Sequence, residues 1–315
     1  MKLLITGIHG FVGSNLVAAL SKEHEIYGLD IIAPAKEGVV KTYSWDDLDA
    51  GRVVDVDAVV HLAGKAHDTK NQAAADVYFK VNRDLTVKVF DYFCAHPGIK
   101  KFVFFSTAKA AADKVEGVLT EDVVPSPVGP YGESKIAAEE YILNTIKNRP
   151  YSFEDRGVYI FRPCMIHGPG NKGNLNLLYN VVRKGIPWPL GAFENRRTFT
   201  SVQNICFAVN GVLTKDVPSG IYNMGDDEAL STNELIEEIC KSLGKKAHIW
   251  RLPKGLMNGI AKVGGLLHLP LNPERLRKLT ENYISSNERI KKALGVERMP
   301  VDAREGLKVT LESFK

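Results

Sequence analysis

The start of the chain constrains the fold more than any other stretch, because three evenly spaced glycines follow a short apolar run. Residues 3–5 are continuously apolar, which is typical of a parallel strand buried on both faces. Gly7, Gly10 and Gly13 come next, and residues 14–20 have the pattern of a helix. Glycines at these positions allow a tight turn, close approach of the backbone to a ligand, and close helix–strand packing. The sequence therefore predicts a phosphate-binding strand–turn–helix unit.

An acidic residue indicates which dinucleotide this unit binds. Residues 25–29 predict a second strand, which ends at Asp30. A carboxylate there accepts hydrogen bonds from both hydroxyls of an adenosine ribose and repels a 2′-phosphate. The helix after Gly13 offers unpaired N–H groups and the positive end of its dipole to the diphosphate. The first thirty residues thus predict NAD, rather than NADP, as the cofactor.

Strand and helix patterns alternate along the first half of the chain. Further strands are expected at 39–45, 57–62, 101–105 and 157–163, and helices at 76–95 and 131–147. This alternation predicts an α/β fold with a doubly wound parallel sheet. Beyond about residue 165 the pattern is irregular: helices are expected at 175–184, from 203, at 232–243 and at 287–294, with a last strand at 221–225.

Two domains follow from this change of pattern. We expect residues 1–165 plus about 198–224 to form a dinucleotide-binding domain, and about 166–197 and 225–315 to form a smaller substrate-binding lobe. The apolar stretch 255–271 is interrupted by Lys262, His268 and Pro270 and is too short to span a bilayer. A helix packed in the core or between subunits is the favoured interpretation, and a surface that touches a membrane or a membrane-bound partner is the alternative.

Charge and cysteine content exclude other classes. A net charge of +4 on 315 residues is too small and too dispersed to indicate a nucleic-acid partner. The four cysteines lack metal-ligand spacing, so we expect free thiols, no metal site and a cytoplasmic protein. No signal peptide is expected, because the first residues already form a strand.

Tyr131 and Lys135 are the candidate chemical residues. They lie four residues apart at the start of a predicted helix and therefore share one face. A phenol with a pKa of about 10 is a poor base at neutral pH, and a neighbouring ammonium, together with oxidised nicotinamide, is expected to lower that pKa. Of the eleven tyrosines, only Tyr131 has a lysine four residues later. Thr107 follows the strand at 101–105, and its hydroxyl could hold the substrate oxygen that Tyr131 protonates or deprotonates.

Together, these residues resemble the NAD-dependent epimerase/dehydratase family, the extended short-chain dehydrogenases/reductases that act on nucleotide-linked sugars. The resemblance implies a Rossmann fold with bound NAD. The segment His61-Leu62-Ala63-Gly64 is similar to the family's loop along the nicotinamide-side ribose, and Asn82 resembles a structural asparagine of the family. The expected cofactor contacts are Gly7, His9, Gly10, Phe11, Val12, Asp30, Leu62, Ala63, Gly64, Tyr131 and Lys135.

Substrate contacts are implied by the same resemblance. The loop from Arg162 to Gly170 is similar to the family motif RxxNxYGP, although Met165 stands where an asparagine is usual. Asn174 and Leu175 are expected to replace that missing contact around the substrate diphosphate. Thr107 is expected to contact the sugar.

Arginines complete the predicted substrate site. Arg197 falls where family members place an arginine on the diphosphate, and its fork of donors suits that anion. The run 269–280 is similar to that of hexosamine-directed bacterial members. Arg275 in this run is included in the predicted site, although the sequence does not separate it from Arg277.

The residues after Thr107 narrow the reaction. Ala108-Lys109 stands where 4,6-dehydratases of the family have Asp-Glu, so a dehydratase is not expected. A 4-epimerase that acts through a 4-keto intermediate on a UDP-hexose or UDP-N-acetylhexosamine is the favoured function, and Asp30 supports it. A 4-keto-6-deoxyhexosamine reductase is the alternative, which Ala108-Lys109 favours. A dinucleotide-sensing protein without catalysis is the third, disfavoured because Tyr131 and Lys135 are both present. A homodimer is expected.

Overall fold

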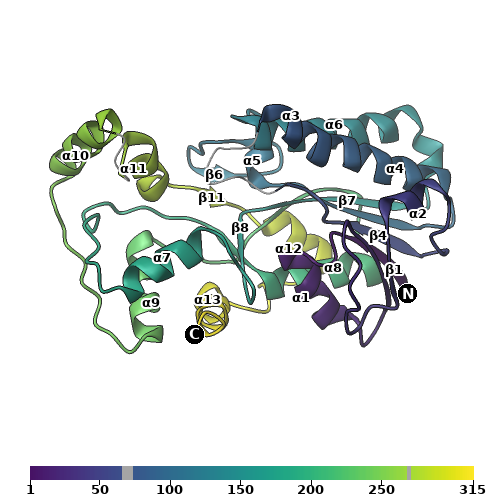
Figure 1. Cartoon of the computed structure of the whole chain (residues 1–315). Coiled ribbons are helices and arrows are strands. Elements are labelled where there is room, and N and C mark those ends of the chain that lie inside the picture. The colour runs from purple at the N-terminus through teal and green to yellow at the C-terminus, as the bar shows by residue number, and fades with distance from the viewer. Residues whose placement is uncertain (66–73, 268–270) are drawn as a thin grey trace.

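The computed structural model describes residues 1–65, 74–267 and 271–315, and its main feature is a parallel sheet covered by helices on both faces (Figure 1). The strand order is β10-β7-β5-β4-β1-β2-β3, and each neighbouring pair is parallel. The strands are β1 Lys2–Thr6, β2 Glu25–Leu29, β3 Lys41–Tyr43, β4 Ala58–His61, β5 Lys101–Phe105, β7 Gly157–Pro163 and β10 Gly220–Met224. The predicted doubly wound α/β fold is confirmed.

Alternation along each strand divides the interior of this domain into two cores. Leu3 and Ile5 of β1 face the core that contains α1 (Phe11–Leu20), α8 (Val202–Thr214) and α12 (Glu288–Leu294). Leu4 faces the other core, with α2 (Trp45–Asp49), α4 (Leu85–Ala95) and α6 (Pro130–Asn148). Because both faces are covered, the strands are continuously apolar, as the sequence predicts for β1.

A smaller group of helices lies at the opposite end of the molecule from the N-terminus (Figure 1). Its helices are α7 Asn174–Arg183, α9 Thr232–Ser242, α10 Lys254–Leu266, α11 Pro273–Thr280 and α13 Ala303–Glu312. A third apolar core holds them together, with Tyr179, Ile239 and Leu307 among its buried residues. Two short parallel pairs also form: β8 (Met165–His167) with β9 (Phe199–Ser201), and β6 (Val118–Leu119) with β11 (Ile284–Ser285).

The division of the chain into two domains stays a prediction, and one element departs from it. Helix α12 falls in the range assigned to the substrate lobe, but its Ile290 and Leu294 are buried in the same core as α1 and α8. The chain therefore returns to the sheet before it ends in α13. Helix α13 itself is not among the elements expected from the sequence.

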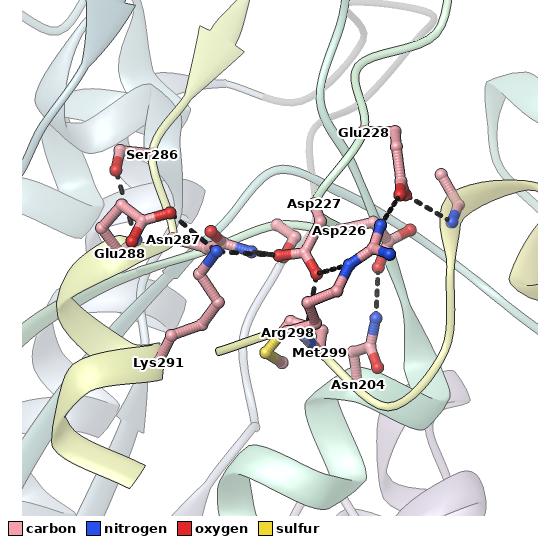
Figure 2. A network of polar contacts seen from close by, with 12 residues as sticks. Asn204, Asp226, Asp227, Glu228, Ser286, Asn287, Glu288, Lys291, Arg298 and Met299 are labelled. Atoms are coloured by element: carbon pink, nitrogen blue, oxygen red, sulfur yellow. Dashed lines mark hydrogen bonds and ion pairs between the residues drawn. The ribbon is translucent and has the colours of Figure 1, made fainter. Parts of the chain in front are cut away.

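A polar network fixes this return (Figure 2). Asp227, just after β10, accepts hydrogen bonds from Asn287 Nδ2 at 2.8 Å and from the Met299 backbone N–H at 2.9 Å. The Lys291 ammonium lies 3.2 Å from the same carboxylate. Burial alone would raise the pKa of Asp227, but these contacts lower it below its usual value. The carboxylate thus joins the end of the sheet to the segment that leads to α13.

The strand expected at 39–45 is shorter because a helix begins inside it. Ser44 caps α2: its hydroxyl accepts the Asp47 N–H at 3.1 Å, and the Asp47 carboxylate accepts the Ser44 N–H at 2.9 Å. This reciprocal capping satisfies N–H groups that a continued strand would have to pair elsewhere. The acidic residues after the strand therefore belong to a helix.

The helix expected at 76–95 contains a wider turn. It consists of α3 (Ala75–Tyr78), a π-helical segment η1 (Phe79–Asp84) and α4. Asn82 lies in η1 and is fully buried. Its Oδ1 accepts the Lys65 N–H at 2.7 Å, and its Nδ2 donates to Ser134 Oγ at 3.0 Å. Single π-helical turns often occur at functional sites, and this one connects the segment after β4 to α6.

Candidate active site

The glycine-rich loop is packed as tightly as its sequence predicts. Gly7 has a φ of 68°, which favours glycine. A Cβ atom on Gly13 would lie 2.5 Å from the Gly7 carbonyl oxygen, so no other residue fits there without moving the loop. Gly10 precedes the first turn of α1 and leaves the N–H groups of that turn facing the carboxyl edge of the sheet.

Asp30 lies beside this loop at the end of β2. One carboxylate oxygen accepts the His9 N–H at 3.0 Å, and the other accepts the Ile31 N–H at 2.7 Å. The loop therefore passes the Asp30 carboxylate and leads into the start of α1. It includes Gly7, His9, Gly10, Phe11 and Val12. A backbone cradle, an open helix N-terminus and an adjacent carboxylate fit the diphosphate and adenosine ribose of NAD.

The segment after β4 lies against the same loop. The Leu62 and Ala63 N–H groups both donate to Thr6 Oγ, at 3.2 and 3.0 Å. A Cβ atom on Gly7 would lie 2.9 Å from the Ala63 nitrogen, which shows how closely the two segments approach. Leu62, Ala63 and Gly64 are thus brought next to the dinucleotide loop, and their contact with the cofactor stays a prediction. Residues 66–73 lie outside the described part of the chain.

A buried hydrogen-bonded chain continues from Thr6 toward Asn82. The Thr86 hydroxyl donates to the Asn82 carbonyl at 2.6 Å, so at the His61 Nε2 contact of 3.0 Å the imidazole is the donor. His61 Nδ1 then accepts from Thr6 Oγ at 2.7 Å. Burial and, to a smaller extent, the charge of Lys135 together lower the pKa of His61 to about 3. A neutral His61 therefore connects the loop to η1.

Thr107 and Tyr131 meet at the carboxyl edge of the sheet. Thr107 follows β5 and caps the short helix α5 (Ala108–Ala111), while Tyr131 lies in the first turn of α6. Their hydroxyls share a hydrogen bond. The Tyr78 ring meets the Tyr131 ring edge-on, with centroids 6.3 Å apart. The structure thus brings together two residues that are 24 positions apart in the sequence.

The pKa of Tyr131 does not shift in the expected direction in the protein alone. Burial raises it, and the hydrogen bond from Thr107 opposes that shift without reversing it. Loss of solvent around the buried phenol is the largest cause of this rise. A lowered pKa therefore needs positive charge beyond that of the chain.

Lys135 lies against the end of β5, one helical turn after Tyr131 on α6. Its Nζ donates to the Phe105 carbonyl at 2.8 Å and lies 4.9 Å from the centre of the Phe104 ring. Burial lowers the pKa of Lys135 to about 8, while the negative charge of Glu139 acts in the opposite direction. A Cβ atom on Gly64 would come within 3.2 Å of this nitrogen. The ammonium thus lies next to the segment expected along the nicotinamide-side ribose.

A buried ion pair lies one helical turn further along α6. Glu139 is 0% exposed and accepts from Arg162 Nη2 at 2.5 Å, with further contacts from Arg162 Nε at 3.0 and 3.1 Å. The Ser106 hydroxyl also donates to Glu139. Ser106 and Glu139 are not among the residues singled out in the sequence. The sequence does contain a signal for this ion pair, because Arg162 interrupts an apolar strand and a buried charge requires a partner.

The predicted substrate residues lie at the lobe end of the sheet but differ in accessibility. Asn174 is exposed at the start of α7, whereas the Leu175 side chain is 2% exposed within the third core. Only the Leu175 backbone can therefore contact a ligand. The Arg197 guanidinium donates to the Lys278 carbonyl at the end of α11, and burial lowers its pKa.

The two arginines of α11 differ in their surroundings. Arg277 Nη1 lies 2.9 Å from Glu281 and 3.5 Å from Asp113, so two carboxylates already hold its guanidinium. Arg275 is exposed. The predicted run 269–280 includes residues 269 and 270, which lie outside the described part of the chain. Among the residues that the structure describes, no cluster of His, Cys, Asp or Glu could hold a metal ion.

This combination of fold and residues defines an extended short-chain dehydrogenase/reductase, the fold of UDP-sugar epimerases. The UDP-glucuronic acid 4-epimerase of Bacillus cereus, solved in complex with NAD, superposes on this chain with a TM-score of 0.75. The match covers 100% of this chain and 98% of that one at 22% identity, which supports the likeness of fold.

The chain belongs to the NAD-dependent epimerase/dehydratase family, whose model matches residues 3–225. It is 32% identical over 276 residues to the UDP-glucose 4-epimerase of Vibrio cholerae, covering 80% of this chain and 78% of that protein. It is 28% identical over 297 residues to the N-acetyl-α-D-glucosaminyl-diphospho-ditrans,octacis-undecaprenol 4-epimerase of Escherichia coli O157:H7, covering 92% of this chain and 84% of the relative. The family comprises NAD-dependent nucleotide-sugar epimerases, dehydratases and reductases.

Proposed function

We propose that this chain is an NAD-dependent 4-epimerase of a nucleotide-linked sugar, with a UDP-hexose or UDP-N-acetylhexosamine as substrate. The observation that carries the proposal is the hydrogen bond between Thr107 and Tyr131, with Lys135 buried one turn later on the same helix and bonded to the end of β5. The two relatives described above are both 4-epimerases by name, which supports the same reaction.

Three side chains have distinct tasks in this proposal. Thr107 holds the oxygen on C4 of the sugar, and Tyr131 removes the proton from that oxygen. NAD, when bound, supplies the hydride acceptor and later the hydride donor for C4. Lys135 positions the nicotinamide-side ribose and favours the phenolate form of Tyr131 by its charge. The 4-keto sugar then rotates so that its other face receives the hydride, and Tyr131 returns the proton to the same oxygen.

Substrate binding falls to the residues between the sheet and the lobe. Arg197 and Arg275 are proposed to bind the diphosphate, together with Asn174 and the backbone of Leu175 at the start of α7. Because Leu175 is buried in the third core, its contribution is limited to the backbone at a helix N-terminus. Arg277, whose guanidinium contacts Glu281 and Asp113, stays the alternative to Arg275 as a diphosphate ligand.

Two other functions keep specific support. A 4-keto reductase would use the same three residues once in each reaction. A dehydratase would need free acid–base groups after Thr107, but Lys109 there lies 3.1 Å from the Asp113 carboxylate. A sugar on a lipid diphosphate is a second candidate substrate, supported by the name of the Escherichia coli relative. A sensor without catalysis is disfavoured because the hydroxyls of Thr107 and Tyr131 are already paired.

The setting of the reaction is part of the proposal. All four cysteines are free, which supports a reducing compartment such as the cytoplasm. No helix in the described part of the chain is long and apolar enough to cross a membrane. We further propose a homodimer, which sedimentation velocity on the full chain tests.

The decisive experiment is turnover of UDP-glucose and UDP-N-acetylglucosamine by the wild-type chain and by Tyr131→Phe. The variant keeps the ring and its packing against Tyr78 but removes the proton acceptor, so turnover should fall by roughly 10²–10⁴. Melting curves and NAD content should match those of the wild type. Undiminished turnover in Tyr131→Phe would eliminate the proposed mechanism, and absence of any 4-epimer from either sugar would eliminate the proposed reaction.

A further inference from the structure

Exposed apolar side chains are concentrated in one short segment of the lobe. Among the described residues, 21 large apolar side chains are exposed, and six of them lie within residues 250–267. Their exposed fractions run from 45% to 79%. These residues are Trp250, Leu256, Ile260, Val263, Leu266 and Leu267. Single exposed apolar residues are ordinary on a protein surface, but a contiguous group indicates an interaction site.

Helix α10 arranges most of these side chains in a stripe. Leu256, Ile260 and Val263 follow at spacings of four and three residues, and Leu267 continues the series just beyond the helix, so all four share one side. We call these four residues the apolar stripe. A different side of the helix carries Met257 and its neighbours, which are buried in the third core. The stripe is therefore additional to the face that anchors the helix.

Helix α10 also lies at an accessible position. It is at the end of the molecule away from the sheet, beyond α7 and α11 (Figure 1). Gly255 and Gly259 have no atom within 4 Å of the position that a Cβ would occupy, so this part of the helix faces open space. The helix has thirteen residues, which gives a length of about 20 Å, too short to cross a bilayer core of about 30 Å.

The segment of sequence that contains the stripe carries charge of only one sign. Residues 239–273 contain six Lys or Arg residues and no Asp or Glu. The rest of the chain has 35 basic and 37 acidic residues, so the excess positive charge of the protein is confined to this segment. Lys254 and Lys262 are exposed on α10 itself, on a different side of the helix from the stripe.

From this pairing of an exposed apolar stripe with an acid-free basic segment, we propose that α10 docks the protein on the surface of an anionic lipid bilayer. The stripe enters the boundary between headgroups and acyl chains, and the basic side chains remain at the level of the anionic headgroups. This inference does not depend on the proposed reaction. Charge favours a bilayer over a second copy of the chain as the occupant, because two copies would place the same basic segments side by side.

Vesicle co-sedimentation of the full chain tests the proposal. Wild-type protein should bind vesicles of equal parts phosphatidylcholine and phosphatidylglycerol, and should bind pure phosphatidylcholine vesicles much more weakly. Ile260→Ser/Val263→Ser should lower the partition constant for anionic vesicles about tenfold or more. Lys254→Gln/Lys262→Gln should lower it about fivefold for each charge removed, and added salt should have a similar effect.

Matched controls separate the stripe from general apolar exposure. Val40→Ser/Tyr151→Ser removes two side chains with exposed fractions of 62% and 85% elsewhere on the protein, and should bind vesicles as the wild type does. Turnover of a UDP-sugar in solution should be unchanged in every variant, because none of these residues belongs to the proposed site. Absence of turnover in the wild type, with vesicle binding intact, would count against the proposed function and not against docking.

Hydrogen exchange on the wild-type chain gives a measurement that needs no variant. Anionic vesicles should slow exchange of the amides of residues 254–266 and leave those of α9 unchanged. The proposal is wrong if the wild type does not bind anionic vesicles, or if the stripe variant binds as well as the control. It is also wrong if the stripe variant converts a dimer to a monomer while vesicle binding is unchanged, because the stripe would then belong to a second copy.

Discussion

The buried pair of Arg162 and Glu139 allows a sharp test of how the site is supported. Their side chains are 2% and 0% exposed, and three hydrogen-bond contacts join them. Arg162→Met keeps most of the apolar stem but removes the guanidinium. The change leaves the Glu139 carboxylate in the interior without its opposite charge, while the Ser106 hydroxyl still donates to it.

The expected loss of stability is large. Removing one partner of a buried pair costs about 3–5 kcal/mol, because the remaining charge keeps its desolvation penalty. With an unfolding entropy of about 2.1 cal/mol/K per residue, this loss lowers the Tm of a 315-residue chain by about 5–8 °C. Glu139→Gln/Arg162→Met should be less destabilised than the sum of its single variants by at least about 1 kcal/mol, because neither charge remains.

Urea denaturation and melting curves of the four proteins measure this cycle. Arg298→Met is the matched control: its guanidinium lies 2.7 Å from Glu228, but its side chain is 73% exposed. An exposed pair contributes little, so this control should melt close to the wild type. Equal effects of Arg162→Met and Arg298→Met, or strictly additive single variants, would refute the reasoning that burial makes the first pair strong.

Three further predictions concern the cofactor, the substrate and the dependence on pH. Calorimetry should show NAD binding at least about tenfold more tightly than NADP, and Asp30→Ala should narrow that gap because the carboxylate no longer repels a 2′-phosphate; a preference for NADP in the wild type would contradict this. Arg197→Ala should raise the KM for a UDP-sugar several-fold with NAD content unchanged, and an unchanged KM would remove Arg197 from the site. Because the pKa of Asp227 is lowered below 3.8 in the folded protein, its contribution to stability is present above that pH and is lost as the pH falls through the folded-state pKa. The Tm of the wild type should therefore exceed that of Asp227→Asn at pH 7, and the two Tm values should converge in acid. A constant difference in Tm at all pH values would count against this linkage.

The sequence by itself determined the parallel sheet and the order of its main elements. Gly7, Gly10 and Gly13 impose a local backbone geometry, and a continuous apolar run implies a strand covered on both faces, so both signals act within a few residues. The same locality explains why Asp30 could be placed beside the loop, and why Thr107 and Tyr131 could be expected at one edge of the sheet.

Tertiary structure decided what depends on neighbours far along the chain. Leu175 is buried because α7 packs into the third core, and Arg277 is neutralised because α11 lies near Asp113, which is 164 residues earlier. The direction of the Tyr131 pKa also came from folding, since it follows from how much solvent the packed elements remove rather than from the lysine four residues away. Burial and charge pairing are sums over the whole fold, whereas turn geometry and periodicity are properties of a short segment.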